Sequence, residues 1–322
     1  MKVAAFNAQR FGLMKVLDPH VVSTLIKIVS RYDIIVILEV VDVSGASIKL
    51  LLSELNKVNT SHHYALQLSS RLGRNRYKEQ YMFLYRDDVV DLIDTYQYED
   101  NQVNDMDAFA REPYILRFKP RHTVLKDLVL IPVHATPRHS ERELDELYDV
   151  LLVVRDKWKT DNIMILGDFR ADDPYVTSEE MEKIRIRTDK NFHWLIADDV
   201  DTTALTSTNR TYDRIVVYGK DLLAAVVPNS AKPFNFQEEF EMTEEMALRV
   251  SDHYPVEVEL TSAPPFWEMR SNQECGNTAV SKAGTEISQD KVMNLQMETL
   301  MLQKEKLQLQ ICLLKQKLAK YQ

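Results

Sequence analysis

The 322-residue sequence has little of what secreted and membrane proteins depend on. It contains only two cysteines, Cys275 and Cys312, and both lie beyond the main apolar pattern, so no disulfide can join parts of the core. No apolar run approaches the roughly 18 residues that span a bilayer. The residues after Met1, KVAAFNAQRF, lack the apolar core and cleavage site of a signal peptide. We therefore expect a protein with no membrane span in a reducing compartment, the cytoplasm first and the nucleus second.

An excess of positive charge is also missing. The chain carries 40 lysines and arginines against 49 acidic residues, a formal net charge of -9. This charge argues against long-range attraction to nucleic acid or to anionic membranes. A polyanionic substrate would have to be held by local arginines and lysines or by bound cations.

The apolar residues predict an α/β domain over residues 1–261. Hydrophobic residues make up 45% of the chain, which is enough for a sizeable core. Short β-branched runs, typical of strands, alternate with amphipathic stretches, typical of helices. The predicted strands are KVAAFN, DIIVILEV, YMFLYR, YILRF, LVLIPVHA, NIMILGD, RIVVY and VEVEL, and the predicted helices are PHVVSTLIKIVSR, ASIKLLLSELNKV and ERELDELYDVLLVVRDKW.

The remainder of the chain has a different character. Residues 262–287 are poor in periodic apolar residues, which predicts a linker. Residues 288–322 carry a heptad pattern, which predicts a coiled-coil helix and self-association. The extra leucines at 302, 309 and 313 leave open a single amphipathic helix that folds back on the main domain. The a positions are Met297, Lys304, Ile311 and Leu318, and the d positions are Leu300, Leu307, Leu314 and Tyr321.

Titratable residues stand at the ends of several predicted strands. Side chains from distant segments can meet at such a rim. Each residue alone has an ordinary structural explanation, such as a turn cap or a surface ion pair, but together they predict a site. Two histidines and several carboxylates without cysteine suit Mg²⁺ or Mn²⁺ better than zinc, and they supply the acid and base that phosphodiester cleavage needs. The residues are Glu39, His134, Asp168, Asp213, Asp252 and His253.

Several longer motifs carry a specific resemblance. They are FNAQRFG, LEVVDVSG, SRLGRNRYKEQY, FAREP, IPVHATP, GDF, DTTALTSTNRTYDRIVV and SDHYPVEVEL. In this order and spacing, over about residues 1–261, they resemble the deoxyribonuclease I family of the endonuclease/exonuclease/phosphatase superfamily, and its deoxyribonuclease-I-like branch above all. The resemblance implies a four-layer α/β/β/α sandwich that hydrolyses DNA endonucleolytically with divalent cations, Mg²⁺ or Mn²⁺.

The resemblance also implies roles for single residues. His134 and His253 would be the acid/base pair, oriented by Glu79 and Asp213. A carboxylate beside an imidazole raises its basicity and fixes its tautomer. The metal and the scissile phosphate would be surrounded by Glu39, Asp168, Asp252 and Asn7, and the further phosphate and DNA contacts would be Arg111, Tyr77, Arg74, Asn75 and Gln9.

The sequence departs from the family pattern at several positions. Arg170 replaces the asparagine of the family's GDFN motif. We expect it to pair with Asp168, and it could either clamp phosphate or repel Mg²⁺, because arginine offers only donors and a full charge. Asp173 and Asn209 occupy the family's disulfide positions, which suits a reducing compartment. Val41 replaces an arginine that some relatives use in the minor groove, so sequence preference should be weaker.

The family's calcium loops are only partly legible. Asp105, Asp107 and Glu112 would belong to one loop, and Asp201 and Thr203 to the other. Ordinary acidic surface loops are an equally good interpretation. Calcium is therefore a second candidate cation.

Three functional hypotheses follow. The first is a divalent-metal-dependent endonuclease that acts on DNA and self-associates through its tail. The second is a nuclease-fold DNA-binding protein with reduced or no catalysis because of Arg170. The third is a phosphodiesterase for another phosphoester, although GRNRYKEQY and AREP favour DNA. The residues neither favour nor oppose actin as a partner.

Overall fold

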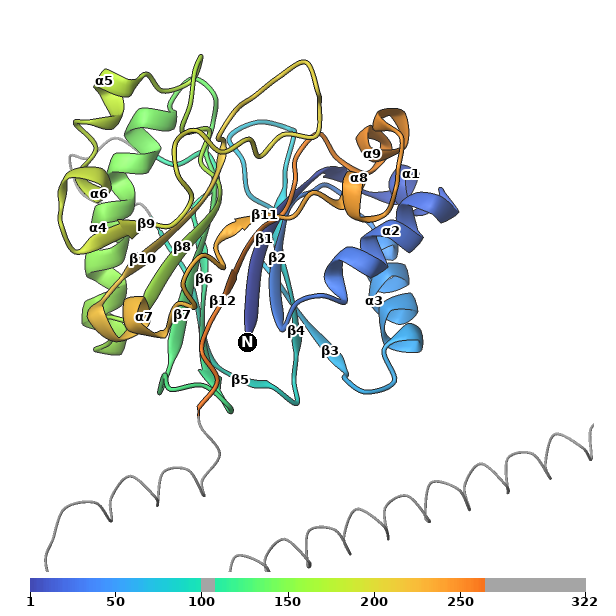
Figure 1. The fold of residues 1–322 in the computed structure, drawn as a ribbon, viewed down its shortest axis with the longest axis horizontal. Coiled ribbons are helices and arrows are strands. Elements are labelled where there is room, and N and C mark those ends of the chain that lie inside the picture. The colour runs from blue at the N-terminus through green and yellow to red at the C-terminus, as the bar shows by residue number, and fades with distance from the viewer. Residues whose placement is uncertain (100–107, 264–322) are drawn as a thin grey trace, which may run out of the picture. The chain divides into compact units, whose positions relative to one another are not determined.

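The computed structural model describes residues 1–99 and 108–263 (Figure 1). Met1–Ala263 form one compact unit. The predicted coiled coil, 288–322, and nearly all of the predicted linker, 262–287, lie outside the described residues. The division of the chain into domain, linker and tail therefore stays a prediction. Within the described ranges, no helix combines the length and the apolar character needed to cross a bilayer.

The first of two mixed six-stranded sheets contains the N-terminal strand. β1 pairs in parallel with β2, and all other neighbours in this sheet are antiparallel. Its strand order is β11 (Lys232–Pro233), β12 (Val256–Glu259), β1 (Lys2–Phe11), β2 (Ile34–Val40), β4 (Gln80–Arg86), β3 (Tyr64–Leu68).

The second sheet is built in the same way around one parallel pair. β7 and β8 are parallel, and the other neighbours are antiparallel. Its strand order is β5 (Val90–Gln97), β6 (Tyr114–Pro120), β7 (Leu128–His134), β8 (Ile163–Asp168), β10 (Asp213–Tyr218), β9 (Phe192–Trp194).

Helices cover the outer face of each sheet (Figure 1). The first sheet is covered by α1 (Leu13–Val16), α2 (Pro19–Val29), α3 (Ala46–Val58), α8 (Phe236–Glu239) and α9 (Glu244–Val250). The second sheet is covered by α4 (Ser140–Trp158), α5 (Ser178–Met181) and α6 (Arg185–Thr188), and α7 (Lys220–Ala225) follows β10.

Three apolar layers hold this arrangement together. Successive side chains of a strand point to opposite faces, so Ala4 and Phe6 of β1 pack under the helices while Val3 and Ala5 pack between the sheets. α4 closes the far side of the second sheet. The prediction of an α/β/β/α sandwich is confirmed.

The strands that the sequence pattern did not predict all lie at the edges of the sheets. β3, β5, β9 and β11 are the edge strands of the two sheets. An edge strand has one unpaired side and tolerates polar residues, so its apolar pattern is weak. β5, VDLIDTYQ, illustrates this with two aspartates. The six helices of four to seven residues, α1 and α5 to α9, were also missed because they are too short for a helical period to appear.

Candidate active site

The predicted catalytic residues lie at adjoining strand ends. His134 ends β7 and Asp168 ends β8, and the two are directly paired in the parallel register. Asp213 begins β10 and is paired with Asp168 on the other side. Gly167 makes this possible, because a Cβ at this position would lie 2.1 Å from the carbonyl oxygen of Val133. Only glycine lets β7 and β8 approach closely enough.

Asn7 connects this group to the first sheet. Its Nδ2 donates to Oε1 of Glu39 and to Oδ2 of Asp168, both at 3.0 Å. Its Oδ1 accepts the backbone N–H of Gln9, which fixes the orientation of the amide. Asn7 is fully buried, so this amide holds two carboxylates of different sheets beside each other.

A bulge between β1 and β2 shapes the same region. Gln9, Arg10 and Glu39 have φ values of 47°, 57° and 57°, which is the left-handed region. The register of β1 and β2 shifts here, between Asn7 and Phe11. The bulge turns the backbone N–H of Arg10 toward Glu39, whose Oε2 accepts it at 3.0 Å. Strained backbone at such a point is typical of functional sites.

Each histidine is held by its own carboxylate. Nδ1 of His134 lies 2.7 Å from Oε2 of Glu79, and Nδ1 of His253 lies 2.8 Å from Oδ2 of Asp213. The two Nε2 atoms face Oδ2 of Asp168, at 3.7 Å from His134 and 3.8 Å from His253. Both histidines and the three carboxylates Glu79, Asp213 and Asp168 are buried. We call Asn7, Glu39, His134, Asp168 and His253 the catalytic rim.

The buried charges shift the pKa values of His253 and Asp168. Burial opposes a charged imidazole at His253, but Asp213 and Asp168 outweigh it and raise the pKa of His253 to about 10. Burial also opposes ionisation of Asp168, yet Arg170, His253 and His134 hold the pKa of that carboxyl well below its usual range. Without a bound cation, His253 therefore carries a proton at neutral pH and faces an ionised Asp168.

The oxygen donors of the rim fit a hard divalent cation. Glu39 and Asp168 each present a carboxylate oxygen to the same point, the amide of Asn7. Oδ1 of Asp252 is buried and makes no hydrogen bond within the described part of the chain, and it lies 3.9 Å from Nε2 of His253. An unsatisfied buried carboxylate oxygen is suited to a metal ligand. Asp168, Asp213 and His253 form a further group of potential ligands, whose ligand atoms lie within 4.8 Å of one another.

Arg170 points into the site. Its φ is 48°, its backbone N–H donates to Oδ1 of Asp168 at 3.1 Å, and its Nη2 lies 3.6 Å from Oδ2 of that carboxylate. The guanidinium carbon also lies 5.1 Å from the ring centre of Tyr175. Its buried Nε makes no hydrogen bond to the residues described. The expected pairing of Arg170 with Asp168 is thus present in the structure.

Two of the predicted DNA contacts lie beside the imidazoles. Nε of Arg111 donates to the backbone oxygen of His134 at 3.2 Å and lies 3.4 Å from Oε2 of Glu79. Tyr77 is 44% exposed, and the guanidinium of Arg10 lies 5.9 Å from its ring centre. Arg10 was not predicted, yet it offers an exposed cation next to Tyr77.

Two further predicted DNA contacts stand on the same loop as Tyr77. Arg74 and Asn75 are exposed on the loop between Leu72 and Glu79, whose ends are joined by backbone hydrogen bonds. Nη2 of Arg74 donates to the backbone oxygen of Phe109 at 3.1 Å.

Comparisons with known proteins agree with this geometry. Residues 4–253 match the Endonuclease/Exonuclease/phosphatase family. The chain belongs to this family. It is similar to Deoxyribonuclease-1-like 1 of Cricetulus griseus, with 45% identity over 81% of this chain and 84% of that protein. It is also similar to Deoxyribonuclease-1 of Bos taurus, with 46% identity over 81% and 92%, and to Deoxyribonuclease gamma of Homo sapiens, with 43% identity over 83% and 88%.

Solved structures of low sequence identity share the fold. The human Nocturnin catalytic domain with bound sulfate anion aligns with a TM-score of 0.54 at 14% identity, over 82% of this chain and 94% of that chain. A functionally unknown conserved protein from Enterococcus faecalis V583 aligns with a TM-score of 0.54 at 17% identity, over 82% of this chain and all of that chain.

The residues proposed for calcium lie apart from one another in the sequence and are only partly described. Oδ1 of Asp201 accepts the backbone N–H and the hydroxyl of Thr203, at 2.9 and 2.7 Å, so this pair already closes its own turn. Glu112 accepts a hydrogen bond from Gln97 through its backbone oxygen. Asp105 and Asp107 lie outside the described residues. Calcium binding stays a prediction for this member of the family.

Three supporting residues were not singled out from the sequence. The hydroxyl of Thr202 donates to Oδ2 of Asp213, and the hydroxyl of Ser251 donates to the backbone oxygen of Asn7 and accepts the N–H of His253. Both stand inside family motifs, DTTALTS and SDHYP, which could have indicated them. Lys15 carries no such signal. Its half-buried side chain donates through Nζ to the backbone oxygens of Ala8 and Val250.

Proposed function

We propose that this chain is a divalent-metal-dependent endodeoxyribonuclease, which hydrolyses phosphodiester bonds within DNA. The observation that carries the proposal is the position of the two imidazoles. Nε2 of His134 and Nε2 of His253 face one carboxylate oxygen of Asp168, at 3.7 and 3.8 Å, and each Nδ1 is held by a separate carboxylate. The similarity to three proteins named as deoxyribonucleases supports DNA as the substrate.

The two histidines take opposite roles in proton transfer. Asp213 holds Nδ1 of His253 and favours the protonated imidazole, so Nε2 of His253 donates a proton to the oxygen that leaves phosphorus. His134 takes the complementary part: Glu79 holds its Nδ1, which leaves Nε2 to accept a proton from the attacking water. One water adds to phosphorus, one phosphorus–oxygen bond breaks, and the two protons balance between the imidazoles.

Positive charge beside the phosphate completes the site. A divalent cation held by Glu39, Asp168 and Asp252 would supply charge against the extra negative charge of the transition state. Arg111 and Arg170 supply fixed positive charge near the same point, because one adjoins His134 and the other Asp168. Tyr77 and Arg10 extend the contact along the DNA backbone.

The other hypotheses from the sequence are not equally well supported. The alternative of a DNA-binding protein without catalysis gains no support from the described residues or from the relatives. Self-association through residues 288–322, calcium near Asp201 and Thr203, and a cytoplasmic or nuclear location remain proposals from the sequence.

Nicking of a supercoiled plasmid tests the function directly. We expect full-length protein to produce open circles with Mg²⁺ or Mn²⁺, and none with EDTA. Adding Ca²⁺ to Mg²⁺ tests the calcium proposal in the same assay. Hydrolysis of a small phosphodiester such as bis(p-nitrophenyl) phosphate, without plasmid nicking, would favour the third hypothesis. Plasmid binding without nicking in every divalent cation would favour a binding protein.

A further inference from the structure

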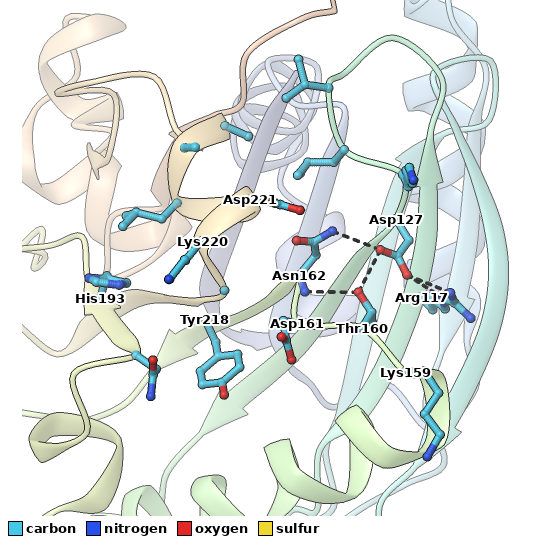
Figure 2. A pocket seen from close by; sticks show the side chains of 18 of the residues that line it. Arg117, Asp127, Lys159, Thr160, Asp161, Asn162, His193, Tyr218, Lys220 and Asp221 are labelled. Atoms are coloured by element: carbon cyan, nitrogen blue, oxygen red, sulfur yellow. Dashed lines mark hydrogen bonds and ion pairs between the residues drawn. The ribbon is translucent and has the colours of Figure 1, made fainter.

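A large cleft lies at the end of the second sheet that is farthest from the catalytic rim. It has a volume of about 1100 Å³. Asn162, directly before β8, lines it, whereas Asp168 stands at the other end of the same strand. A six-residue strand is ~20 Å long at about 3.3 Å per residue, so one phosphate cannot contact both places. We call this space the basic cleft (Figure 2).

One wall of the basic cleft is rigid. Asp127 is buried and accepts hydrogen bonds from Arg117, Thr160 and Asn162, at 2.8 to 3.2 Å (Figure 2). The charge of Arg117 is therefore matched within the wall. A network in which each polar group is satisfied keeps its geometry when a ligand binds.

The base of the cleft is also fixed by a close backbone contact. Gly219 has a φ of 98°, and a Cβ there would lie 2.2 Å from the backbone oxygen of Asp161. The turn after β10 can thus lie directly against the turn before β8. This contact carries Lys220, the next residue, to the cleft, where Figure 2 shows it on the same side as His193.

The unpaired charge in the cleft is positive. Five basic and three acidic side chains line it, on a chain whose net charge is -9. Lys126, Lys190 and Lys220 are exposed, and none of them forms an ion pair in the described part of the chain. Asp221 is the one lining carboxylate that is likewise unpaired among these residues, since Asp161 pairs with Arg155. The cleft is therefore a local basic site on an acidic protein.

We propose that the basic cleft binds the phosphates of a single nucleic-acid strand, separately from the segment held at the catalytic rim. The three lysines come from three different segments, so their charges are spread around the cleft and do not converge on one point. Such a distribution suits several phosphates along a chain. His193 adds an aromatic ring next to these charges, the combination that single-strand sites use. The ring of Tyr218 also lines the cleft, although it packs against Phe192 and the guanidinium of Arg155.

Binding of a fluorescein-labelled dT12 oligonucleotide in EDTA tests this proposal without turnover. The full chain is compared with Lys190→Glu/Lys220→Glu and with Lys49→Glu/Lys57→Glu, which makes the same charge change on α3. We expect the cleft variant, Lys190→Glu/Lys220→Glu, to bind dT12 at least ~10-fold more weakly than wild type. The slope of log K against log salt concentration should be smaller in magnitude by roughly 1.4, because two phosphate contacts are lost. The α3 variant should bind dT12 within about 2-fold of wild type.

A photo-crosslink locates the bound strand. dT12 carrying 5-iodouracil should label His193 or Tyr218 in wild type, and this label should vanish in the cleft variant. Plasmid nicking by the cleft variant should remain within about 2-fold of wild type, because the rim is intact. The proposal of a separate binding site is wrong if both charge variants bind dT12 equally weakly. It is also wrong if the crosslinks lie at Tyr77 alone, or if the cleft variant loses plasmid nicking.

Discussion

Arg170 contacts Asp168 twice, through its backbone N–H at 3.1 Å from Oδ1 and through its guanidinium at 3.6 Å from Oδ2. The second contact uses the oxygen that also faces Nε2 of His134 and Nε2 of His253. A cation that binds Asp168 must share this oxygen with the guanidinium or displace it. The pair therefore sets how readily the site accepts a metal.

We predict that Arg170→Asn lowers the Mg²⁺ concentration for half-maximal nicking and raises the rate. The amide can contact phosphate without opposing the charge of the metal. The measurement is a Mg²⁺ titration of nicking on one supercoiled plasmid, with Arg187→Asn on α6 as the control for charge.

The opposite result has an equally clear meaning. Slower cleavage by Arg170→Asn at saturating Mg²⁺ would show that the guanidinium binds phosphate in the transition state. Its unpaired buried Nε is available for that contact. If neither midpoint nor rate changes, Arg170 takes no part in the reaction.

Removal of either imidazole should disable the enzyme while the fold persists. We predict that His134→Ala and His253→Ala each reduce nicking by at least roughly 100-fold, the usual loss for a general acid or base. His63→Ala serves as the control, because this exposed histidine pairs with Asp87 and is not part of the catalytic rim. Circular dichroism checks the fold. Near-normal nicking by either rim variant contradicts the assignment.

The structure brings together residues that the sequence singled out because they stand inside long motifs at strand ends. Asn7, His134 and Asp168 end or interrupt apolar runs, and this local signal is visible without coordinates. The edge strands gave a weaker signal, since one side of β3 or β5 has no partner.

Other features could not be predicted because they depend on segments that only meet in space. The position of the Lys15 side chain depends on the carbonyl of Val250, 235 residues away. The basic cleft forms where the turns at Asp161 and Gly219 touch, and neither turn has a distinctive composition. The orientation of Arg170 depends on its φ of 48° and on Tyr175, not on the GDF motif alone.

The raised pKa of His253 predicts how stability depends on pH in EDTA. A histidine in the unfolded chain titrates near 6.5, and in the folded chain this one titrates at about 10. The contribution of His253 to the free energy of unfolding is complete below pH ~6.5. It is lost as pH rises toward about 10, and the free energy of unfolding then falls by at most ~1.4 kcal/mol per pH unit. Urea unfolding at several pH values should show this fall in wild type. A His253→Gln variant with the same slope would refute it.

The predicted coiled coil can be tested by truncation. Removal of residues 288–322 should leave a folded, active monomer, because the described unit ends at Ala263 and contains the whole catalytic rim. Full-length protein should self-associate at micromolar concentration in sedimentation equilibrium. A monomeric full-length protein, or an insoluble truncated one, would contradict this prediction.

Lys15 should act as a positioning residue for the two segments that carry the site. Its Nζ donates to Ala8, in the bulge beside Glu39, and to Val250, just before His253. Burial lowers the pKa of Lys15 to about 8, although Asp252 and Glu39 oppose the shift. The ammonium is thus held by carbonyls and carboxylates together, and its loss leaves two buried carbonyls without a donor.

We predict that Lys15→Met lowers the free energy of unfolding by about 1–3 kcal/mol, the usual effect of leaving such groups unsatisfied. It should also raise the Mg²⁺ midpoint of nicking, because Glu39 and Asp252 lose the group that orders their segments. Urea unfolding and the Mg²⁺ titration measure the two effects, and Lys49→Met on α3 is the matched control. Lys15→Arg should recover part of the Mg²⁺ affinity, since a guanidinium can still donate to both carbonyls. A stability loss with an unchanged Mg²⁺ midpoint would make Lys15 a purely structural residue.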